Sequence, residues 1–541
     1  MASGMLDRWF KEWVMFAKYR RWILVVLVLA VIGWVKFSPR LGVAPGGDAP
    51  SAGAEAGVGI AAEAAPTRGP AVVRKLGRLA FSPCTLAPEF GTQTVEAQCS
   101  RLLVPENHAV PSGRKISLAI AWLPAKGEAK PDPVFMLAGG PGQSALEAYP
   151  ATASAYSEVN KTRDVILVDQ RGTGGSNRLI CKDSGGKSAI VEDDDYGLEA
   201  AKAFAARCAT ELSKKADLRF YSTSDAIQDL EAVRVAIGAA QINLSGGSYG
   251  TRVGQQYAKR YPAQTRTLTI DGIVPNTLIL GNEHARNLES SLDSQFDRCV
   301  RTKGCVEKLG NPRARLNALM AQLRVAPPMV RYRDAITGEA KQEQLTAGHV
   351  ATLTRMFAYA PAVAGLLPLE LNEAAQGRYE SLMALSKLLA STVGDQIMHG
   401  MQLSVICTED AAELQADPAD AGSLLGVDMI NLLKAQCEVW PQGKRPADFR
   451  QPLTGAVPVL ILSGEFDPVT PPRYGDVVQR SLPNSRHLVL RGQGHNTLGV
   501  GCMPKLFARF LDSADARKLD ATCLDKLPYA VPFTGFYGWE P

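Results

Sequence analysis

A serine flanked by glycines is the first group of the chain that could do chemistry. Ser248 is the centre of GGSYG (residues 246–250), which follows the short apolar run INL and opens into the helical pattern TRVGQQYA. A serine on a sharp turn from a strand into a helix exposes its hydroxyl and can act as a nucleophile. Flanking glycines leave room for the strained backbone of such a turn. A glycine-rich turn that holds a serine without catalytic role is the alternative, because the motif is short.

A serine nucleophile needs a base to remove its proton and an acid to orient that base. Downstream of Ser248, two strand-like runs each end near a suitable residue. The run VPVLILS leads to Asp467, and the run HLVL leads to His495. Since the carboxyl ends of neighbouring parallel strands lie along one edge of a sheet, we expect these side chains to converge with Ser248. Glu465 is the alternative acid, and a turn-capping role is the alternative for Asp467.

Acyl transfer by a serine also needs two hydrogen-bond donors for the oxyanion of the tetrahedral intermediate. The backbone N–H of Tyr249, directly after the serine, is one candidate. The other is the N–H of Gly140 in the turn GGPG (residues 139–142), with Gly139 next to it. This turn lacks the Lys-Ser/Thr pair of a phosphate-binding loop, and the chain has no H-E-x-x-H zinc motif. We therefore expect neither a cofactor nor a metal.

Strand-like and helical patterns alternate around these residues. We predict strands at 115–123, 132–137, 164–169, 242–244, 266–271, 457–463 and 487–490. Continuous β-branched runs of this kind are typical of parallel strands covered on both faces. Between residues 278 and 450 helical patterns such as 374–389 and 429–435 take over. The sequence therefore predicts an α/β protein with a mostly parallel sheet and a helical cap inserted before the last two strands.

The N-terminal segment differs in composition from the rest of the chain. Five basic residues at positions 8–21 precede an apolar run, which is typical of a secretory signal or a signal anchor. The run is shorter than the about 20 residues that a spanning helix needs. However, Trp22 and Trp34 suit membrane interfaces, and no small-x-small cleavage site follows directly. We favour an inner-membrane anchor at residues 22–37, with a cleaved signal peptide as the alternative.

The expected organisation has five parts, which follow from these patterns. They are a basic segment with the anchor or signal (1–37), an Ala/Gly/Pro-rich linker (38–71), a first core part (72–277), the helical cap (278–452) and a C-terminal core part (453–541). The linker has almost no large apolar residue, so it cannot bury a core of its own.

Composition and cysteine content limit the classes of protein to which the chain can belong. The chain has 541 residues, 46% hydrophobic and 21% charged, with a formal net charge of +5. This charge is small for the length and does not suggest a nucleic-acid-binding surface. Ten cysteines fall in five successive near pairs without a C-x-x-C motif, a pattern that suits disulfides in an oxidising compartment. We predict pairing in order, namely Cys84–Cys99, Cys181–Cys208, Cys299–Cys305, Cys407–Cys437 and Cys502–Cys523; ten reduced cysteines in a cytosolic enzyme are the alternative.

Five short motifs, in this order, resemble those of a known family. They are AGGPGQSA (138–145), DQRGTGGSN (169–177), LSGGSYG (244–250), LSGEFDPVTPP (462–472) and GQGH (492–495). They look like the α/β-hydrolase-fold serine peptidases that include prolyl iminopeptidases and secreted tripeptidyl aminopeptidases. The resemblance covers roughly residues 75–525 and implies that fold, with Ser248, Asp467 and His495 as the catalytic triad. Family members often have His where Ala138 stands, which affects the packing of this loop but leaves its backbone donors in place.

The resemblance also implies a substrate class. Members of this family cut near a free N-terminus, and acidic groups of their cap bind the substrate's ammonium. In this chain Glu409 is the first candidate for that role and Asp410 the second, in the segment of residues 404–410 that Cys437 is expected to fix. A surface acidic pair at the end of a helix is the alternative.

These observations lead to one expected function and two rivals. We expect an exported serine hydrolase, periplasmic or otherwise extracytoplasmic, that releases N-terminal amino acids or short peptides through an acyl-enzyme. Its partners would be peptide substrates and not nucleic acid, and the sequence leaves the oligomeric state open. A carboxylesterase acting on small acyl esters is the rival enzyme. A binding protein that has kept a hydrolase scaffold is the rival outside enzymes.

Overall fold

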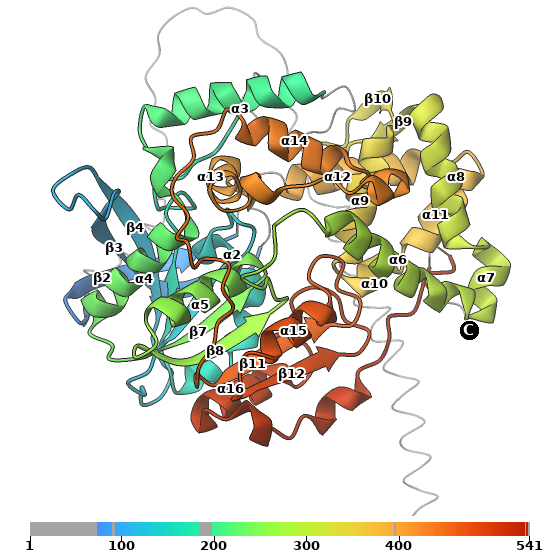
Figure 1. Ribbon diagram of the computed structural model, residues 1–541. Helices are drawn as coiled ribbons and strands as arrows, with labels where there is room; N and C mark the ends of the chain where they lie inside the picture. The colour runs from blue at the N-terminus through green and yellow to red at the C-terminus, as the bar shows by residue number, and fades with distance from the viewer. Residues whose placement is uncertain (1–72, 89–91, 183–196, 394–395, 536, 539–541) are drawn as a thin grey trace, which may run out of the picture. The chain divides into compact units, whose positions relative to one another are not determined.

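A ten-stranded β-sheet carries the elements that end at the predicted catalytic residues (Figure 1). The computed structural model describes residues 73–88, 92–182, 197–393, 396–535 and 537–538. The predicted anchor at 22–37 and the linker at 38–71 therefore lie outside the described residues. None of the helices within the described ranges is both long and apolar enough to cross a membrane.

The strands follow one another in the spatial order β1-β2-β3-β4-β6-β5-β7-β8-β11-β12. Their bounds are β1 Arg74–Leu76, β2 Leu79–Leu86, β3 Val95–Pro105, β4 Lys115–Leu123, β5 Val134–Leu137, β6 Val165–Val168, β7 Ile242–Gly247, β8 Thr265–Asp271, β11 Val459–Gly464 and β12 Ser485–Leu490. The strands β6, β5, β7, β8, β11 and β12 run parallel, whereas β1 to β4 pair antiparallel and β4 pairs antiparallel with β6. The predicted mostly parallel sheet is confirmed.

The parallel strands are apolar because helices cover both of their faces. Every residue of β5 (VFML) and β6 (VILV) is buried. One face packs against α4 Thr223–Ile237, α5 Tyr249–Arg260 and α15 Pro472–Gln479. The helix α3 Leu198–Ser213 shares this hydrophobic cluster but packs against helices of the insertion. The other packs against α2 Ala145–Thr152 and α16 Met503–Ser513. The strands β1 to β3 were not predicted, since β3 alternates polar and apolar residues and lacks a continuous apolar run.

The insertion between β8 and β11 is mainly helical. Its helices are α6 His284–Val300, α7 Lys303–Leu309, α8 Pro312–Val325, α9 Ala347–Ala358, α10 Pro361–Ala364, α11 Leu367–Ala375, α12 Glu380–Val393, α13 His399–Glu409 and α14 Asp428–Cys437. Leucines and other apolar side chains of α6, α8, α9, α11 and α12 form a hydrophobic cluster of their own. The limits 278 and 452 of a separate cap stay a prediction.

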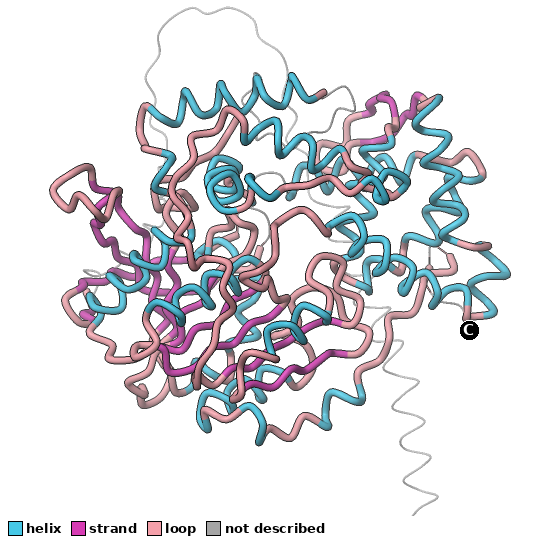
Figure 2. Tube along the Cα trace, in the orientation of Figure 1, coloured by secondary structure: helices cyan, strands magenta, loops and turns pink. Residues whose placement is uncertain are grey.

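Two details of the insertion differ from the sequence-based expectation. The single helix predicted at 374–389 is wrong, because α11 ends at Ala375 and α12 begins at Glu380. Gly377 between them has φ +79°, a left-handed conformation that interrupts a helix. A two-stranded hairpin, β9 Met329–Arg333 and β10 Ala340–Gln344, was also not predicted (Figure 2).

Five disulfides connect the cysteines in the predicted order. The pairs are Cys84–Cys99, Cys181–Cys208, Cys299–Cys305, Cys407–Cys437 and Cys502–Cys523. The prediction of sequential pairing is confirmed, and every cysteine is used. One of the bridges joins α13 to α14 within the insertion, directly before the acidic pair Glu409 and Asp410.

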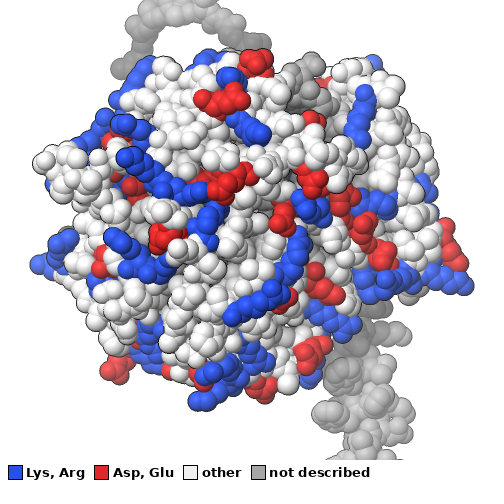
Figure 3. Space-filling model, in the orientation of Figure 1, with Lys and Arg blue, Asp and Glu red and all other residues white. Residues whose placement is uncertain are grey.

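Basic and acidic side chains are interspersed on the face drawn in Figure 3. Several of the exposed ones form ion pairs, such as Lys259 with Asp448 at 3.0 Å and Arg286 with Asp417 at 3.1 Å. Exposed pairs of this kind contribute at most about 1 kcal/mol each to stability. A nucleic-acid-binding surface gathers basic residues on one face instead. Basic residues are not gathered into one patch on this face.

Candidate active site

Ser248 lies on the turn that joins β7 to α5. Its backbone has φ 54° and ψ −124°, a conformation that few non-glycine residues adopt. A Cβ at Gly246 would lie 2.4 Å from Gly250 O, and a Cβ at Gly250 would lie 2.3 Å from Leu137 O. The turn can therefore form only with glycine at both positions. The geometry is that of the predicted nucleophile turn between strand and helix.

The acid and the base come from the ends of the two last strands. Asp467 follows β11 and His495 follows β12, and Asp467 Oδ2 lies 2.7 Å from His495 Nδ1. The backbone N–H groups of Val469 and Thr470 donate to Asp467 Oδ1 at 2.9 and 2.8 Å, and the Thr470 hydroxyl donates to Oδ2 at 2.8 Å. Glu465, the alternative acid, instead accepts hydrogen bonds from the Gly492 N–H and the Tyr529 hydroxyl.

Asp467 and His495 each stabilise the charged form of the other. Burial alone would raise the pKa of Asp467, but the neighbouring His495 and the backbone donors hold it below its ordinary value. Burial alone would lower the pKa of His495, but Asp467 and, more weakly, Asp271 raise it above its ordinary value. A carboxylate that stays ionised beside an imidazole stabilises the imidazolium that forms when the base takes a proton.

The turn of Ser248 and the loop of His495 are in contact. A Cβ at Gly247 would lie 3.2 Å from Asn496 Oδ1, so the residues next to the serine and next to the histidine touch. A Cβ at Gly272, after β8, would lie 2.8 Å from His495 Cε1, and thus the missing side chain makes room for the imidazole. Among the described residues none forms a hydrogen bond with the Ser248 hydroxyl. Catalytic hydrogen bonds are often long before substrate binds.

The two expected oxyanion donors also lie near the serine. Tyr249 is the first residue of α5, where backbone N–H groups have no partner within the helix. A Cβ at Gly139 would lie 3.1 Å from Ser248 Cβ, so the turn of residues 139–142 lies against the nucleophile. The Gly139 N–H donates to Gln143 Oε1 at 3.2 Å, which leaves the N–H of Gly140 as the available donor. Tyr249 and Gly140 therefore keep the roles expected for them as our proposal.

Comparison with known proteins adds an independent line of evidence. A family model described as alpha/beta hydrolase fold matches residues 132–305, and one described as TAP-like protein matches residues 423–523. The serine protease Hip1 of Mycobacterium tuberculosis is 25% identical over 488 residues, which cover 83% of this chain and 92% of that protein. The chain has the α/β-hydrolase fold.

Other relatives of this hydrolase are peptidases. A tripeptidyl aminopeptidase of Streptomyces coelicolor is 30% identical over 190 residues, which cover 33% of this chain and 35% of that protein. A proline iminopeptidase of Xylella fastidiosa is 27% identical over 141 residues, which cover 26% of this chain and 32% of that protein. The predicted resemblance to the prolyl iminopeptidase and tripeptidyl aminopeptidase group is confirmed, and the chain is a serine hydrolase.

Asp271, the last residue of β8, is a site residue of the hydrolase that the sequence did not indicate. Its backbone oxygen accepts the Ser248 N–H at 2.9 Å. Its carboxylate accepts the N–H groups of Thr497 and Leu498 at 2.5 and 2.7 Å and the Thr497 hydroxyl at 3.0 Å. One residue thus holds both the nucleophile turn and the loop that follows His495. The signal that could have found it is position, since β8 lies between β7 and β11.

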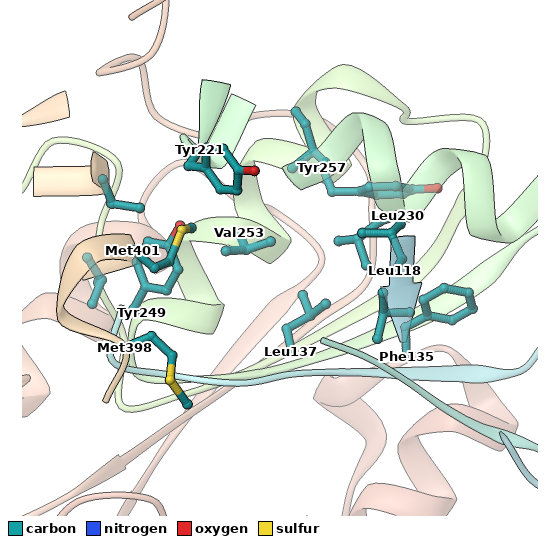
Figure 4. Close-up of a cluster of buried hydrophobic side chains, with 14 of the residues drawn as sticks. Leu118, Phe135, Leu137, Tyr221, Leu230, Tyr249, Val253, Tyr257, Met398 and Met401 are labelled. Atoms are coloured by element: carbon teal, nitrogen blue, oxygen red, sulfur yellow. The ribbon is translucent and has the colours of Figure 1, made fainter. Parts of the chain in front are cut away.

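The insertion of the hydrolase reaches the active site at two places. The Met398 N–H, directly before α13, donates to Gly142 O at 2.9 Å. In Figure 4, Met398 and Met401 lie beside Tyr249, and all three belong to one buried cluster. At the other place, the Tyr359 carbonyl after α9 accepts the His495 N–H at 2.9 Å, and the two rings meet edge to face at 5.2 Å. The insertion therefore contacts both the turn of residues 139–142 and the loop that contains His495.

The acidic pair Glu409 and Asp410 is buried and has partners within the protein. Glu409 Oε1 accepts the Thr223 N–H at 2.6 Å, and Oε2 lies 3.5 Å from Arg252 Nη1. Asp410 is 0% exposed and pairs with Arg252 at 2.9 Å and Arg450 at 2.8 Å. Burial raises the pKa of Glu409 to about 7, although Arg252 opposes this. The alternative of an exposed acidic pair does not fit this burial.

Proposed function

We propose that this hydrolase is a serine exopeptidase that releases amino acids or short peptides from the N-terminus of peptides through an acyl-enzyme. In this mechanism His495 takes the proton of Ser248 as the hydroxyl attacks the carbonyl carbon. Asp467 orients His495 and stabilises its charged form, and the N–H groups of Tyr249 and Gly140 hold the oxyanion. His495 then gives the proton to the leaving amine, and water, activated by the same histidine, releases the acyl group.

The observation that carries this proposal is the hydrogen bond between Asp467 and His495 beside the turn of Ser248. A 2.7 Å contact to Nδ1 leaves Nε2 as the nitrogen that can act on the nucleophile. The choice of peptides over other acyl compounds is supported by the relatives, which are named serine protease, tripeptidyl aminopeptidase and proline iminopeptidase.

We further propose that the enzyme works outside the cytoplasm. Five disulfides support an oxidising compartment, because cytosolic thiols are kept reduced. The periplasm and an anchor formed by residues 22–37 remain the more specific prediction.

A substrate panel tests the exopeptidase proposal. The purified enzyme is given tripeptidyl and aminoacyl amides with a free N-terminus, the same amides with an acetylated N-terminus, and small acyl esters. We expect the unblocked amides to be cleaved with a kcat/KM at least about tenfold above that of the acetylated ones, because an exopeptidase binds the free terminus. Turnover of esters without any turnover of amides would establish the carboxylesterase instead.

Glu409 and Asp410 remain our candidates for the group that binds the substrate's ammonium. Glu409→Gln keeps the shape of the side chain and removes its charge. If the carboxylate binds the free terminus, KM for unblocked amides rises about tenfold while the kinetics of simple esters stay the same. An equal loss on both substrate classes, together with a lower Tm, would mean that Glu409 only supports the fold through Thr223 and Arg252. Asp448→Asn, a charge loss at an exposed ion pair, is the control.

A further inference from the structure

The helix α9 places an arginine close to the catalytic histidine. Tyr359, at the end of α9, is fixed against the histidine loop by the hydrogen bond from the His495 N–H. A Cβ at Gly494 would lie 2.1 Å from Tyr359 O, so the two segments approach as closely as backbones can. Arg355 is four residues before Tyr359 and therefore lies on the same face of the helix. Burial raises the pKa of Tyr359, and the charge of Arg355 opposes this rise, so Arg355 lies near the Tyr359 side chain, whose ring contacts the imidazole of His495.

Among the described side chains, Arg355 lacks the carboxylate partner that two other arginines of the insertion, Arg286 and Arg313, have. Arg286 pairs with Asp417 at 3.1 Å, and Arg313 pairs with Glu289 at 2.8 Å. Arg355 Nη1 instead lies 3.7 Å from the sulfur of Met429, a weak acceptor. Within the described part of the chain no carboxylate forms an ion pair with Arg355, although the residue is half-buried. A guanidinium without a counter-ion keeps its N–H donors available to a bound anion.

The other groups near Arg355 add no negative charge that is free to bind it. Burial, together with the nearby charges of Arg355 and His495, lowers the pKa of His284, at the start of α6, to about 3, so this imidazole is neutral at ordinary pH. The carboxylates next to His495 already have partners, since Asp467 is bound by His495 and Thr470, and Asp271 accepts hydrogen bonds from the loop after His495. The surroundings of Arg355 therefore suit a negatively charged ligand.

We propose that Arg355 binds a carboxylate of the substrate next to the bond that is cleaved, so that the enzyme prefers acidic substrates. The planar guanidinium offers two parallel N–H donors, and such a fork matches a carboxylate in geometry and charge. Arg355 is thus a specificity residue: it touches the substrate but not the reacting atoms. The inference rests on the proposed catalytic role of Ser248, His495 and Asp467 but not on the choice between amides and esters.

Matched pairs of substrates test the inference. One series is peptide amides with Glu or Gln next to the scissile bond; the other is esters with a succinyl or a butyryl acyl group. In wild type we expect the charged member of a pair to have a kcat/KM about tenfold higher than the neutral one. In Arg355→Met, which keeps the apolar stem, this ratio should fall to about one while turnover of the neutral member stays within about twofold. Arg355→Lys should keep part of the preference, because it retains the charge but loses the fork.

Arg286→Met is the matched control, since it removes one positive charge from the same insertion at an exposed ion pair. It should leave the ratio unchanged. Equal turnover of charged and neutral members by wild type, or an equal loss on both in Arg355→Met, would overturn the inference. If only the esters are cleaved, the exopeptidase proposal fails, and the ester series still decides the role of Arg355.

Discussion

Ser248→Ala is expected to abolish turnover of every substrate, lowering kcat by about 10⁴-fold or more. The reason is that no other nucleophile is placed on the turn between β7 and α5, and removal of the hydroxyl prevents the acyl-enzyme from forming. The fold should stay intact, because the hydroxyl forms no hydrogen bond with any described residue and alanine is smaller than serine. The measurements are kcat with the best substrate of the panel, and labelling by a fluorophosphonate probe, which should be lost.

Ser245→Ala is the control for this variant. Ser245 lies three residues earlier in β7, is 2% exposed, and its hydroxyl lies 3.0 Å from the Tyr156 hydroxyl. The change should lower the free energy of unfolding by about 1–2 kcal/mol but leave labelling and kcat near wild type. Activity in Ser248→Ala above a trace would rule out the mechanism proposed here.

Asp271→Asn should lower kcat/KM by about 10- to 100-fold, mainly through kcat. One carboxylate oxygen becomes an NH₂ group, which cannot accept a hydrogen bond from Thr497 or Leu498. The loop behind His495 then loses part of its support, and the imidazole is no longer held in register with Ser248. Thr497→Val removes only the hydroxyl contact to Asp271 and should have a smaller effect.

The pH profile separates a role in positioning from a role in folding. Asp271 helps to raise the pKa of His495, so loss of its charge lowers that pKa. The neutral imidazole then persists to lower pH, and the acid limb of kcat/KM against pH should shift downward in Asp271→Asn. In wild type, burial raises the pKa of Asp271 itself to about 6. Asp271 and His495 therefore both take up a proton as the pH falls, and kcat/KM should decrease more steeply than it would for a single protonation. An unshifted acid limb with a lowered Tm would mean that Asp271 serves stability alone.

Residues that follow from local pattern could be predicted from the sequence. The parallel strands are short continuous apolar runs, and both Asp467 and His495 directly follow such runs in polar, glycine-containing loops. The order of the cysteines sufficed for the disulfides, because each pair is close in sequence. The strands and the residues after them follow from short stretches of sequence, and each cysteine pairs with its neighbour along the chain, 6 to 30 residues away.

Residues whose role depends on distant contacts could not be predicted. Asp271 resembles any acidic residue at a strand end until Thr497 and Leu498 are placed beside it. Glu409 and Asp410 could be read as exposed or as substrate-binding, because only the tertiary structure brings Arg252 and Arg450 against them. The break at Gly377 was missed because the helical pattern continues on both sides of it.

The hydrogen bond from the His495 N–H to the Tyr359 carbonyl has a consequence for how this enzyme can be engineered or can evolve. The insertion is not a detachable cover, since its backbone supplies a contact that holds the general base. A swing of the whole insertion away from the sheet would break this hydrogen bond. In a chimera that receives the insertion of a relative, the loop of His495 would stay in place only if the new segment also placed a backbone carbonyl next to the His495 N–H. Deleting the insertion would remove this carbonyl and so disturb the position of His495.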